Sequence, residues 1–260
     1  MSCCLSPDTS PVAVITGAGR RIGREIAVLL ASQGVAVALH CHESVDDART
    51  VAEEIQDMGG KACVLQADLR REVSVVDVIG HAAAQLGTVG ILINNASTFE
   101  YDAVDTVTRD SWDAHMEVNL WAPLVLTQAF SAQIPPDMTG CVVNILDQRV
   151  WSLTPHFISY TVSKTGLWTL TQTLALALAP RIRVNAIGPG PALPSARQSE
   201  VQFSAQCAAL PLQRGTTPVE IAEAVSFILS APAMTGQMIA LDGGQHLGWS
   251  FPTSSAQPDE

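Results

Sequence analysis

The chain has 260 residues, of which 47% are hydrophobic and 15% are charged, and its formal net charge at pH 7 is −11. This composition is typical of a compact folded chain and excludes extensive disorder. The negative charge disfavours nucleic acids and anionic membrane surfaces as partners, and no apolar run is long enough for a membrane helix.

Short apolar runs and helical periodicities alternate along the chain. In chain order, strand 12–16 precedes helix 22–33, strand 35–40 precedes helix 45–58, and strand 62–66 precedes helix 72–86. Strand 89–94 then precedes a long helix at about 110–133, and strand 141–146 precedes helix 160–178. Strand 182–187 is followed by a weakly patterned stretch at about 188–217, a helix at 218–230 and a last strand at 237–242.

The predicted strands are apolar throughout and do not alternate between apolar and polar residues. Such strands are buried on both faces, which is typical of a parallel sheet covered by helices on both sides. No proline- or serine-rich linker divides the chain. The sequence therefore predicts an α/β protein with a seven-stranded parallel sheet, comprising an N-terminal tail at 1–10, one Rossmann-fold domain at 11–246 and a C-terminal tail at 247–260.

A glycine-rich turn joins the first predicted strand to the first predicted helix. Gly17, Gly19 and Gly23 would let the backbone turn sharply and approach a pyrophosphate, with the positive end of the helix aimed at its charge. Glycine triplets are common by themselves, but this one lies between a strand and a helix at the head of an α/β pattern. We interpret the turn as a dinucleotide-binding site.

A tyrosine and a lysine lie on one face of the predicted helix 160–178. Tyr160 and Lys164 have i, i+4 spacing, so their side chains are neighbours. The lysine charge favours the phenolate and lowers the pKa of the tyrosine. A tyrosine in this state can give or take the proton that accompanies hydride transfer, so the pair indicates redox chemistry.

Several motifs together resemble the classical short-chain dehydrogenase/reductase family, over about residues 12–244. In the family's order the chain carries Thr16-Gly-x-x-x-x-Ile-Gly23, Asn94-Asn95-Ala96, Tyr160-x-x-x-Lys164, NAIGPG at 185–190 and TGQMIALDGG at 235–244. The resemblance implies that Tyr160 and Lys164 are catalytic and that Asn119 holds a water of a proton relay. It also implies cofactor contacts from Gly17, Arg21, Ile22, Asp68, Leu69, Asn95, Ala96, Lys164, Pro189 and Gly190.

The residues after the second predicted strand favour NADP(H) as the cofactor. An acidic residue there would bind the ribose diol and select NAD(H), but Cys41 stands in that place. Arg20, Arg21 and Ser44 offer positive charge and a hydroxyl to a 2′-phosphate. Glu43 departs from the arginine that NADP-using relatives often have, so NAD(H) stays open as an alternative.

Two histidines lie on one face of the same strand. His40 and His42 are two residues apart, which raises the question of a metal site. No third ligand is near in the sequence. We interpret them as structural or cofactor-edge residues, place His42 among the cofactor contacts and predict no metal site.

Asp147 departs from the family pattern. Carbonyl-reducing members have a serine in this place, and an ionised aspartate would repel the oxyanion that forms during ketone reduction. It would also raise the pKa of Tyr160 and so oppose Lys164. An aspartate suits the reduction of a C=N bond, because the nitrogen must then be protonated.

Three further residues point to a heteroaromatic substrate. Ser97 can bond to a flat ring, Phe99 can stack on it from the face opposite the nicotinamide, and Arg21 can reach its oxo group. Together with Asp147 and Tyr160, these residues resemble the pteridine reductase branch of the family. That resemblance implies NADPH-dependent reduction of a dihydropteridine, dihydromonapterin or dihydrofolate. The alternative for Phe99 is a packing role under its loop.

Two other functions stay open. One is a carbonyl or alcohol oxidoreductase of the same family, such as a ketone or 3-oxoacyl reductase, in which Asp147 is a tolerated substitution. The other is a non-enzymatic dinucleotide sensor, against which the intact Asn119, Tyr160 and Lys164 argue.

The resemblance also implies a homotetramer, with helices 110–133 and 160–178 at the interface. The expected ligand is a small heteroaromatic molecule, and neither a nucleic acid nor a membrane is an expected partner. The six cysteines are scattered without a C-x-x-C pair, which is typical of reduced thiols and predicts a cytoplasmic protein.

Overall fold

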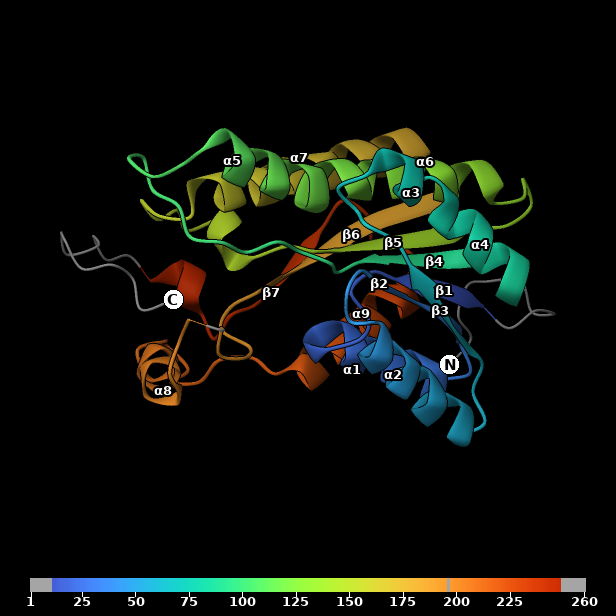
Figure 1. Ribbon diagram of the computed structural model, residues 1–260, viewed down its shortest axis with the longest axis horizontal. Helices are drawn as coiled ribbons and strands as arrows, with labels where there is room; N and C mark the ends of the chain where they lie inside the picture. Colours follow the sequence, from blue (N-terminus) through green and yellow to red (C-terminus); the bar gives the residue numbers. More distant parts are fainter. Residues whose placement is uncertain (1–10, 196, 249–260) are drawn as a thin grey trace.

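A single parallel sheet of seven strands organises the molecule (Figure 1). The computed structural model describes residues 11–195 and 197–248, so the expected tail at 1–10 and most of that at 247–260, including Trp249, lie outside the described residues. The strands run in the spatial order β3-β2-β1-β4-β5-β6-β7, which confirms the predicted Rossmann fold. They are β1 (Val12–Ile15), β2 (Ala36–Cys41), β3 (Ala62–Gln66), β4 (Val89–Asn94), β5 (Gly140–Ile145), β6 (Ile182–Pro189) and β7 (Met238–Leu241).

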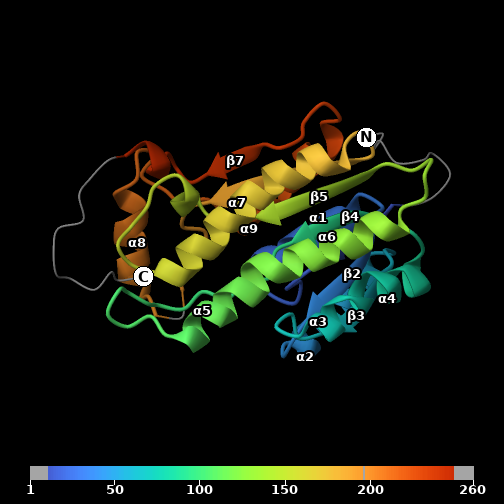
Figure 2. The ribbon, with the colours of Figure 1, turned by 90° about the horizontal axis from the view of Figure 1, so that it is seen from above.

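Helices cover both faces of the sheet. In Figure 1, α3 to α7 lie on one face, and α1, α2 and α9 lie on the other. Seen from above in Figure 2, α5 and α6 follow one another along the sheet beside α7. The helices are α1 (Arg21–Ser32), α2 (Val45–Asp57), α3 (Glu72–Val75), α4 (Asp77–Leu86), α5 (Arg109–Met116), α6 (Ala122–Gln133), α7 (Ile158–Leu178), α8 (Glu200–Ala208) and α9 (Pro218–Ser230).

The hydrophobic core has two layers because successive strand residues point to opposite faces of the sheet. Ala13 and Ile15 of β1 pack in the layer beneath α1, α2 and α9. Val12 and Val14 of the same strand pack in the layer beneath α4, α6 and α7. All four are buried, which explains why the strand sequence is apolar at every position. Among the described residues, no helix is long and apolar enough to cross a membrane.

The strand order reverses direction at β1. This strand pairs with β2 on one side and with β4 on the other, so the chain leaves the centre of the sheet in two directions. In open α/β sheets, ligands bind outside the carboxyl ends of the strands at such a point. The loops that follow β1, β4, β5 and β6 converge at this edge, and they carry several of the residues with expected functions, among them Gly17, Asn95, Asp147 and Gly190.

The weakly patterned stretch at 188–217 contains a helix that the sequence analysis missed, α8. Ser199 and Gln202 form a capping box at its start, with Ser199 Oγ accepting a hydrogen bond from the Gln202 amide at 3.3 Å. The described residues of α8 include none that is buried. The helix therefore lacks the buried apolar face that gives a helical period in the sequence. Its capping box was the only feature of the sequence that indicated a helix.

The long helix expected at 110–133 is interrupted in the middle. Between α5 and α6 the chain forms a π-helical turn, η1 (Glu117–Trp121), in which Asn119 is fully buried. Such turns are frequent at functional sites. The helix expected at 72–86 is likewise divided, into α3 and α4.

Candidate functional site

The turn between β1 and α1 forms a cradle that fits a phosphate group. Gly17 has a φ of +66°, a conformation that favours glycine. A Cβ atom on Gly23 would lie 2.2 Å from the Gly17 carbonyl oxygen, so the helix approaches the loop more closely than a side chain allows. No side chain among the described residues caps the start of α1. The amide groups there are thus available to an anion, as a dinucleotide pyrophosphate requires.

His40 ties this turn to the end of β3. Its Nδ1 atom accepts a hydrogen bond from the Gly17 amide at 3.3 Å, and Nε2 lies 3.1 Å from the Ala67 carbonyl oxygen, to which it donates. Burial lowers the pKa of His40 to about 4, so the ring is neutral at pH 7. His40 is therefore a structural residue that positions the phosphate cradle.

Two adjoining clefts contain all the residues expected to bind the cofactor. The first, of about 510 Å³, is lined by Gly17, Arg20, Arg21, Ile22, His42, Ser44, Asp68, Leu69, Asn95 and Ala96. The second, of about 280 Å³, is lined by Lys164, Pro189 and Gly190. Arg21, Ile22, Asn95 and Ser97 line both, so the clefts form one continuous path.

The distal end of the first cleft carries several charged groups. Arg20 pairs with Asp47 at 2.6 Å in an exposed position. Arg70, which the sequence analysis did not single out, bonds to Asp68 at 2.9 Å, and this hydrogen bond lowers the pKa of the Asp68 carboxyl to about 2. Glu43 points mostly to solvent, with 88% of its side chain exposed.

Asn95 and Ala96 close the other side of the cradle. The amides of both residues donate to the Thr16 hydroxyl at 2.9 Å. The Asn95 side chain donates to the Thr16 carbonyl at 2.8 Å. These bonds fasten the loop after β4 to the loop after β1, so the two halves of the cofactor path hold a fixed geometry.

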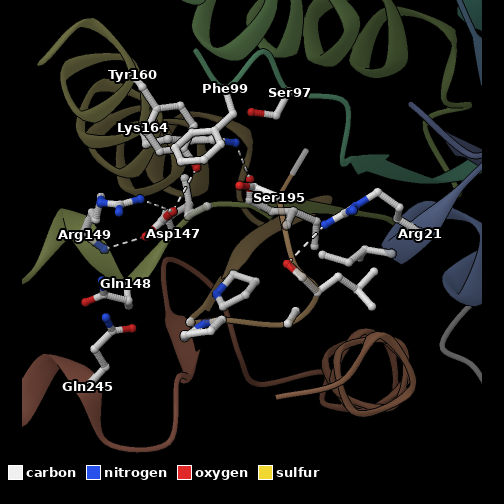
Figure 3. A pocket seen from close by; sticks show the side chains of 18 of the residues that line it. Arg21, Ser97, Phe99, Asp147, Gln148, Arg149, Tyr160, Lys164, Ser195 and Gln245 are labelled. Carbon is white, nitrogen blue, oxygen red and sulfur yellow. Dashed lines mark hydrogen bonds and ion pairs between the residues drawn. The ribbon is translucent and has the colours of Figure 1, made fainter. Parts of the chain in front are cut away.

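Tyr160 and Asp147 meet at the centre of the second cleft (Figure 3). The Tyr160 hydroxyl donates to Asp147 Oδ2 at 2.9 Å. Asp147 Oδ1 accepts from the Arg149 amide at 2.8 Å, which caps the short 3₁₀ helix η2 (Gln148–Val150) and fixes the carboxylate. The structure thus brings together two residues that the sequence analysis placed in one reaction.

The expected lowering of the Tyr160 pKa by Lys164 is wrong for this arrangement. Burial, followed by the negative charge of Asp147, raises the pKa of Tyr160 well above its usual value. The phenol is therefore protonated at neutral pH and acts as a hydrogen-bond donor. The opposing effect of Asp147, considered from the sequence, prevails because the site is buried.

Lys164 is buried below the tyrosine. Its Nζ atom donates to the Ile145 carbonyl at 2.8 Å and lies 5.8 Å from the centre of the Tyr160 ring. Burial lowers the pKa of Lys164 to about 8. The ammonium group and the phenol therefore share one small polar pocket without bonding directly to one another.

Asn119 lies beside this pocket, in the π-helical turn. Its side chain accepts from the Thr98 amide at 2.8 Å and donates to the Ser163 hydroxyl at 3.1 Å. The Ser97 hydroxyl donates to the same Asn119 oxygen at 3.1 Å. Asn119 thus joins the loop after β4 to α7, and it holds Ser97 at the mouth of the cleft.

Phe99 has both a lining and a packing role. It lines the second cleft and meets the Tyr160 ring edge-on, with ring centres 4.7 Å apart. On its other side it stacks on Phe157, at 4.7 Å and 11° between the ring planes. The Arg149 guanidinium lies 5.0 Å from the centre of the Phe157 ring. The π electrons of the ring attract this cation. The two roles considered from the sequence therefore coexist.

Arg21 contacts the loop that follows β6. Its guanidinium donates to the Pro194 and Leu193 carbonyls at 3.0 and 3.3 Å. The residue also lines both clefts. Arg21 thus links the phosphate cradle to the loop after β6.

Sequence reasoning missed several residues that line the second cleft. Gln148 and Arg149 follow Asp147 directly, so their position after β5 was an available signal. Gln245 had none, because it is brought in from the short 3₁₀ helix η3 (Gln245–Leu247) after β7. Ser195, Gln198, Phe203 and Gln206 come from the unassigned loop and α8.

Comparison with known proteins agrees with this geometry. A family model described as short chain dehydrogenase matches residues 11–204. An uncharacterised oxidoreductase of Methylorubrum extorquens is 34% identical over 242 residues, which are 90% of this chain and 96% of the relative. The 3-oxoacyl-[acyl-carrier-protein] reductase FabG of Staphylococcus epidermidis is 31% identical over 241 residues, which are 90% of this chain and 98% of the relative.

A solved structure is more similar still. FolM alternative dihydrofolate reductase 1 from Brucella canis, crystallised with NADP, superimposes with a TM-score of 0.91. It is 48% identical to this chain, and the match covers 94% of this chain and 97% of that one.

Proposed function

Because the chain belongs to the short-chain dehydrogenase family, we propose that it is an NADPH-dependent reductase of pterin-type substrates. The candidates are dihydropteridines, dihydromonapterin and dihydrofolate. The observation that carries the proposal is the hydrogen bond of 2.9 Å between Tyr160 and the Asp147 carboxylate inside the substrate cleft. The FolM neighbour, named a dihydrofolate reductase and crystallised with NADP, supports both the substrate class and the cofactor.

The negative charge of Asp147 disfavours reduction of a ketone and favours reduction of a C=N bond. Reduction of a ketone builds negative charge on the substrate oxygen, and a carboxylate at the same place opposes it. Reduction of a C=N bond leaves a nitrogen that must take up a proton. A carboxylate stabilises a protonated nitrogen, because opposite charges attract at short range.

Four residues of the cleft have roles in this reaction. The bound nicotinamide supplies the hydride. Tyr160 is protonated at neutral pH and gives its proton to the ring nitrogen, while Asp147 orients the phenol and attracts the nitrogen. Lys164 supplies positive charge below the phenol, which stabilises the phenolate that forms. Phe99 provides a flat wall for the ring.

The cofactor path has its own set of contacts. The uncapped amides at the start of α1 and the closely packed Gly17 and Gly23 hold the pyrophosphate. His42, Ser44 and Arg20 surround the place of a 2′-phosphate, and Glu43 is directed to solvent, so its charge opposes NADPH little. Pro189 and Gly190 face the nicotinamide end.

The second candidate is a 3-oxoacyl or ketone reductase, which the similarity to FabG favours. FabG is 31% identical to this chain, whereas the FolM neighbour is 48% identical. A ketone reductase would also have to form an oxyanion next to the Asp147 carboxylate. A dinucleotide sensor without activity is the third possibility.

The test is oxidation of NADPH by the purified protein with 7,8-dihydrobiopterin, 7,8-dihydromonapterin or dihydrofolate, compared with a panel of ketones and a 3-oxoacyl thioester. We expect turnover of pterins and none of ketones. Turnover of ketones alone would establish the second candidate. Tight NADPH binding without turnover of either class would establish the sensor.

A homotetramer through the outer faces of α6 and α7 is part of the proposal. A groove there is lined by apolar residues, among them Leu120, Leu124 and Leu170, and Trp121 beside it is 41% exposed. Light scattering on the purified chain gives the assembly mass directly. A monomer at micromolar concentration would exclude this assembly.

A further inference from the structure

Two glutamine side chains in the substrate cleft each have a buried oxygen without a hydrogen-bond partner among the residues that the structure describes. They are Gln148 Oε1 and Gln245 Oε1. Both residues line the cleft that holds Asp147 and Tyr160. Gln148 is only 4% exposed. Leaving a buried acceptor without a partner is unfavourable, so a site that keeps two of them is suited to a ligand that donates to them.

The glutamines are held in place from two separate elements. Gln148 opens η2, which the Asp147 carboxylate caps through the Arg149 amide at 2.8 Å. Gln245 opens η3, and Asp242 anchors that turn by accepting from the Gly244 amide at 3.0 Å and from the His246 amide at 2.8 Å. These bonds fix the backbone of both turns, and the Gln148 side chain is already buried before a ligand binds, which favours selective binding.

The position of the pair relative to the reacting residues restricts what it can contact. Figure 3 shows Gln148 and Gln245 on the side of Asp147 that is away from Arg21. Gln148 is the direct neighbour of Asp147 in the chain. A group bound by the glutamines therefore lies at the Asp147 end of the cleft, away from Arg21.

Dihydropterin chemistry identifies this group. In a 7,8-dihydropterin the reduced bond joins N5 to C6, and C6 carries the variable substituent. Hydride from NADPH adds to C6, the N5=C6 double bond becomes a single bond, and the Tyr160 proton goes to N5. The 6-substituent thus lies one bond from the reacting carbon, next to Asp147.

We propose, on the basis of the proposed function, that Gln148 and Gln245 determine specificity by accepting hydrogen bonds from hydroxyl groups on the 6-substituent of a dihydropterin. Amide oxygens accept from hydroxyl groups and cannot bond to an alkyl group. An alkyl substituent would leave both oxygens buried and unsatisfied. The unfavourable free energy of these two unpaired oxygens therefore outweighs what the apolar contacts of an alkyl substituent contribute to binding.

The test compares two substrates that differ only in two hydroxyl groups, one for each glutamine. They are 7,8-dihydrobiopterin and 6-propyl-7,8-dihydropterin, and the readout is the ratio of their kcat/KM values with saturating NADPH. For the wild-type chain we expect the hydroxylated substrate to be favoured about 100-fold, and Gln148→Met or Gln245→Met each to lower the ratio about tenfold, because each variant removes one of the two hydrogen bonds. Methionine keeps the length of the side chain and removes the acceptor.

Controls separate loss of fold from loss of recognition. Gln85→Met, at an exposed position of α4, should leave the ratio unchanged. Thermal unfolding of each variant reports the fold, and Gln245→Met at a half-buried position serves if Gln148→Met does not fold. NADPH affinity should be equal in all the chains.

The outcomes are distinct for the two proposals. A wild-type ratio near one, or an unchanged ratio in Gln245→Met, would overturn the role of the glutamines and leave the pterin reductase standing. Absence of turnover with both pterins would overturn the proposed function and this inference with it. A lower ratio in each variant, with the propyl substrate still reduced, supports both.

Discussion

The Tyr160 hydroxyl donates to the Asp147 carboxylate at 2.9 Å within the second cleft. Burial and this carboxylate raise the pKa of Tyr160 well above its ordinary value. The residue that departs from the family pattern therefore changes the pKa of the residue that we propose as the acid. The phenol carries a proton at neutral pH, next to a negative charge that attracts a basic nitrogen.

We expect Asp147→Asn to lower kcat/KM for a dihydropterin about 100-fold, because proton transfer loses its charged partner. Asparagine keeps one acceptor oxygen, so it can replace Asp147 in only one of the hydrogen bonds to the Tyr160 hydroxyl and the Arg149 amide. Because Asp147 does not line the first cleft, the dissociation constant of NADPH should change less than about twofold. Asp113→Asn, exposed on α5, is the matched control. Equal losses of turnover and of NADPH binding would mean that Asp147 mainly organises the pocket.

The same variant should lower the pKa of Tyr160, because the Asp147 charge is one cause of its rise. The chain has only two tyrosines, so tyrosinate absorbance during an alkaline titration resolves them. Tyr101→Phe assigns the remaining signal. An unchanged Tyr160 pKa in Asp147→Asn would contradict the electrostatic account.

We expect Phe99→Leu to raise KM for a dihydropterin about fivefold, because an aromatic contact with the ring is lost. NADPH binding should stay the same, since Phe99 does not line the first cleft. Phe227→Leu, 53% exposed on α9, is the control. If KM were unchanged and only thermal stability fell, Phe99 would have the packing role alone.

Arg20→Ala should weaken NADPH binding about tenfold and NADH binding less than about twofold, because only NADPH carries the 2′-phosphate. The effect should shrink in high salt, since the Arg20 side chain is largely exposed. Fluorescence titration with both cofactors measures it, and Arg109→Ala on α5 is the control. Equal weakening for the two cofactors would assign Arg20 to the pyrophosphate instead.

His40 should make the protein less stable in acid. The unfolded chain protonates this histidine near pH 6.5, whereas the folded chain resists protonation until about pH 4. Between these values the unfolded state binds more protons, so the free energy of unfolding falls as the pH decreases. From about pH 7.5 to about pH 5, this group alone should remove about 2 kcal/mol.

Urea unfolding at both pH values checks this prediction. His40→Gln keeps an acceptor and a donor but does not titrate, so it should flatten that part of the pH dependence. His81→Gln, exposed on α4, is the control. If the free energy of unfolding fell equally between the two pH values in the wild-type chain and in His40→Gln, the acid sensitivity would not come from His40.

Local patterns predicted most helices and strands, because the residues that an element buries recur along the sequence with the period of that element. Strands β3 and β4 and helix α9 have the predicted bounds, since each is bounded by polar or turn residues. Helix α8 escaped detection because none of its described residues is buried. The π-helical turn at Asn119 also left no pattern, since it depends on hydrogen bonds to Thr98 and Ser163.

The backbone at Phe157 shows how a tertiary contact overrides local preference. This residue has a φ of +56°, which is unusual outside glycine. Its amide donates to the Asp102 carbonyl at 2.7 Å, and its ring is stacked on Phe99 and fully buried. Contacts from one distant segment, the loop after β4, hold the conformation that begins α7. The residues next to Phe157 in the chain therefore do not predict it.

The sequence alone determined the sheet, the glycine turn and the Tyr160–Lys164 pair, because each depends on spacings of a few residues along the chain. It also identified Asp147 as a departure from the family pattern. Only the tertiary structure decided that burial and Asp147 outweigh Lys164 in the ionisation of Tyr160. The folded chain likewise brought Gln245 to Gln148 from a segment almost one hundred residues away. Burial and long-range proximity depend on how distant segments pack, which no spacing along the chain records.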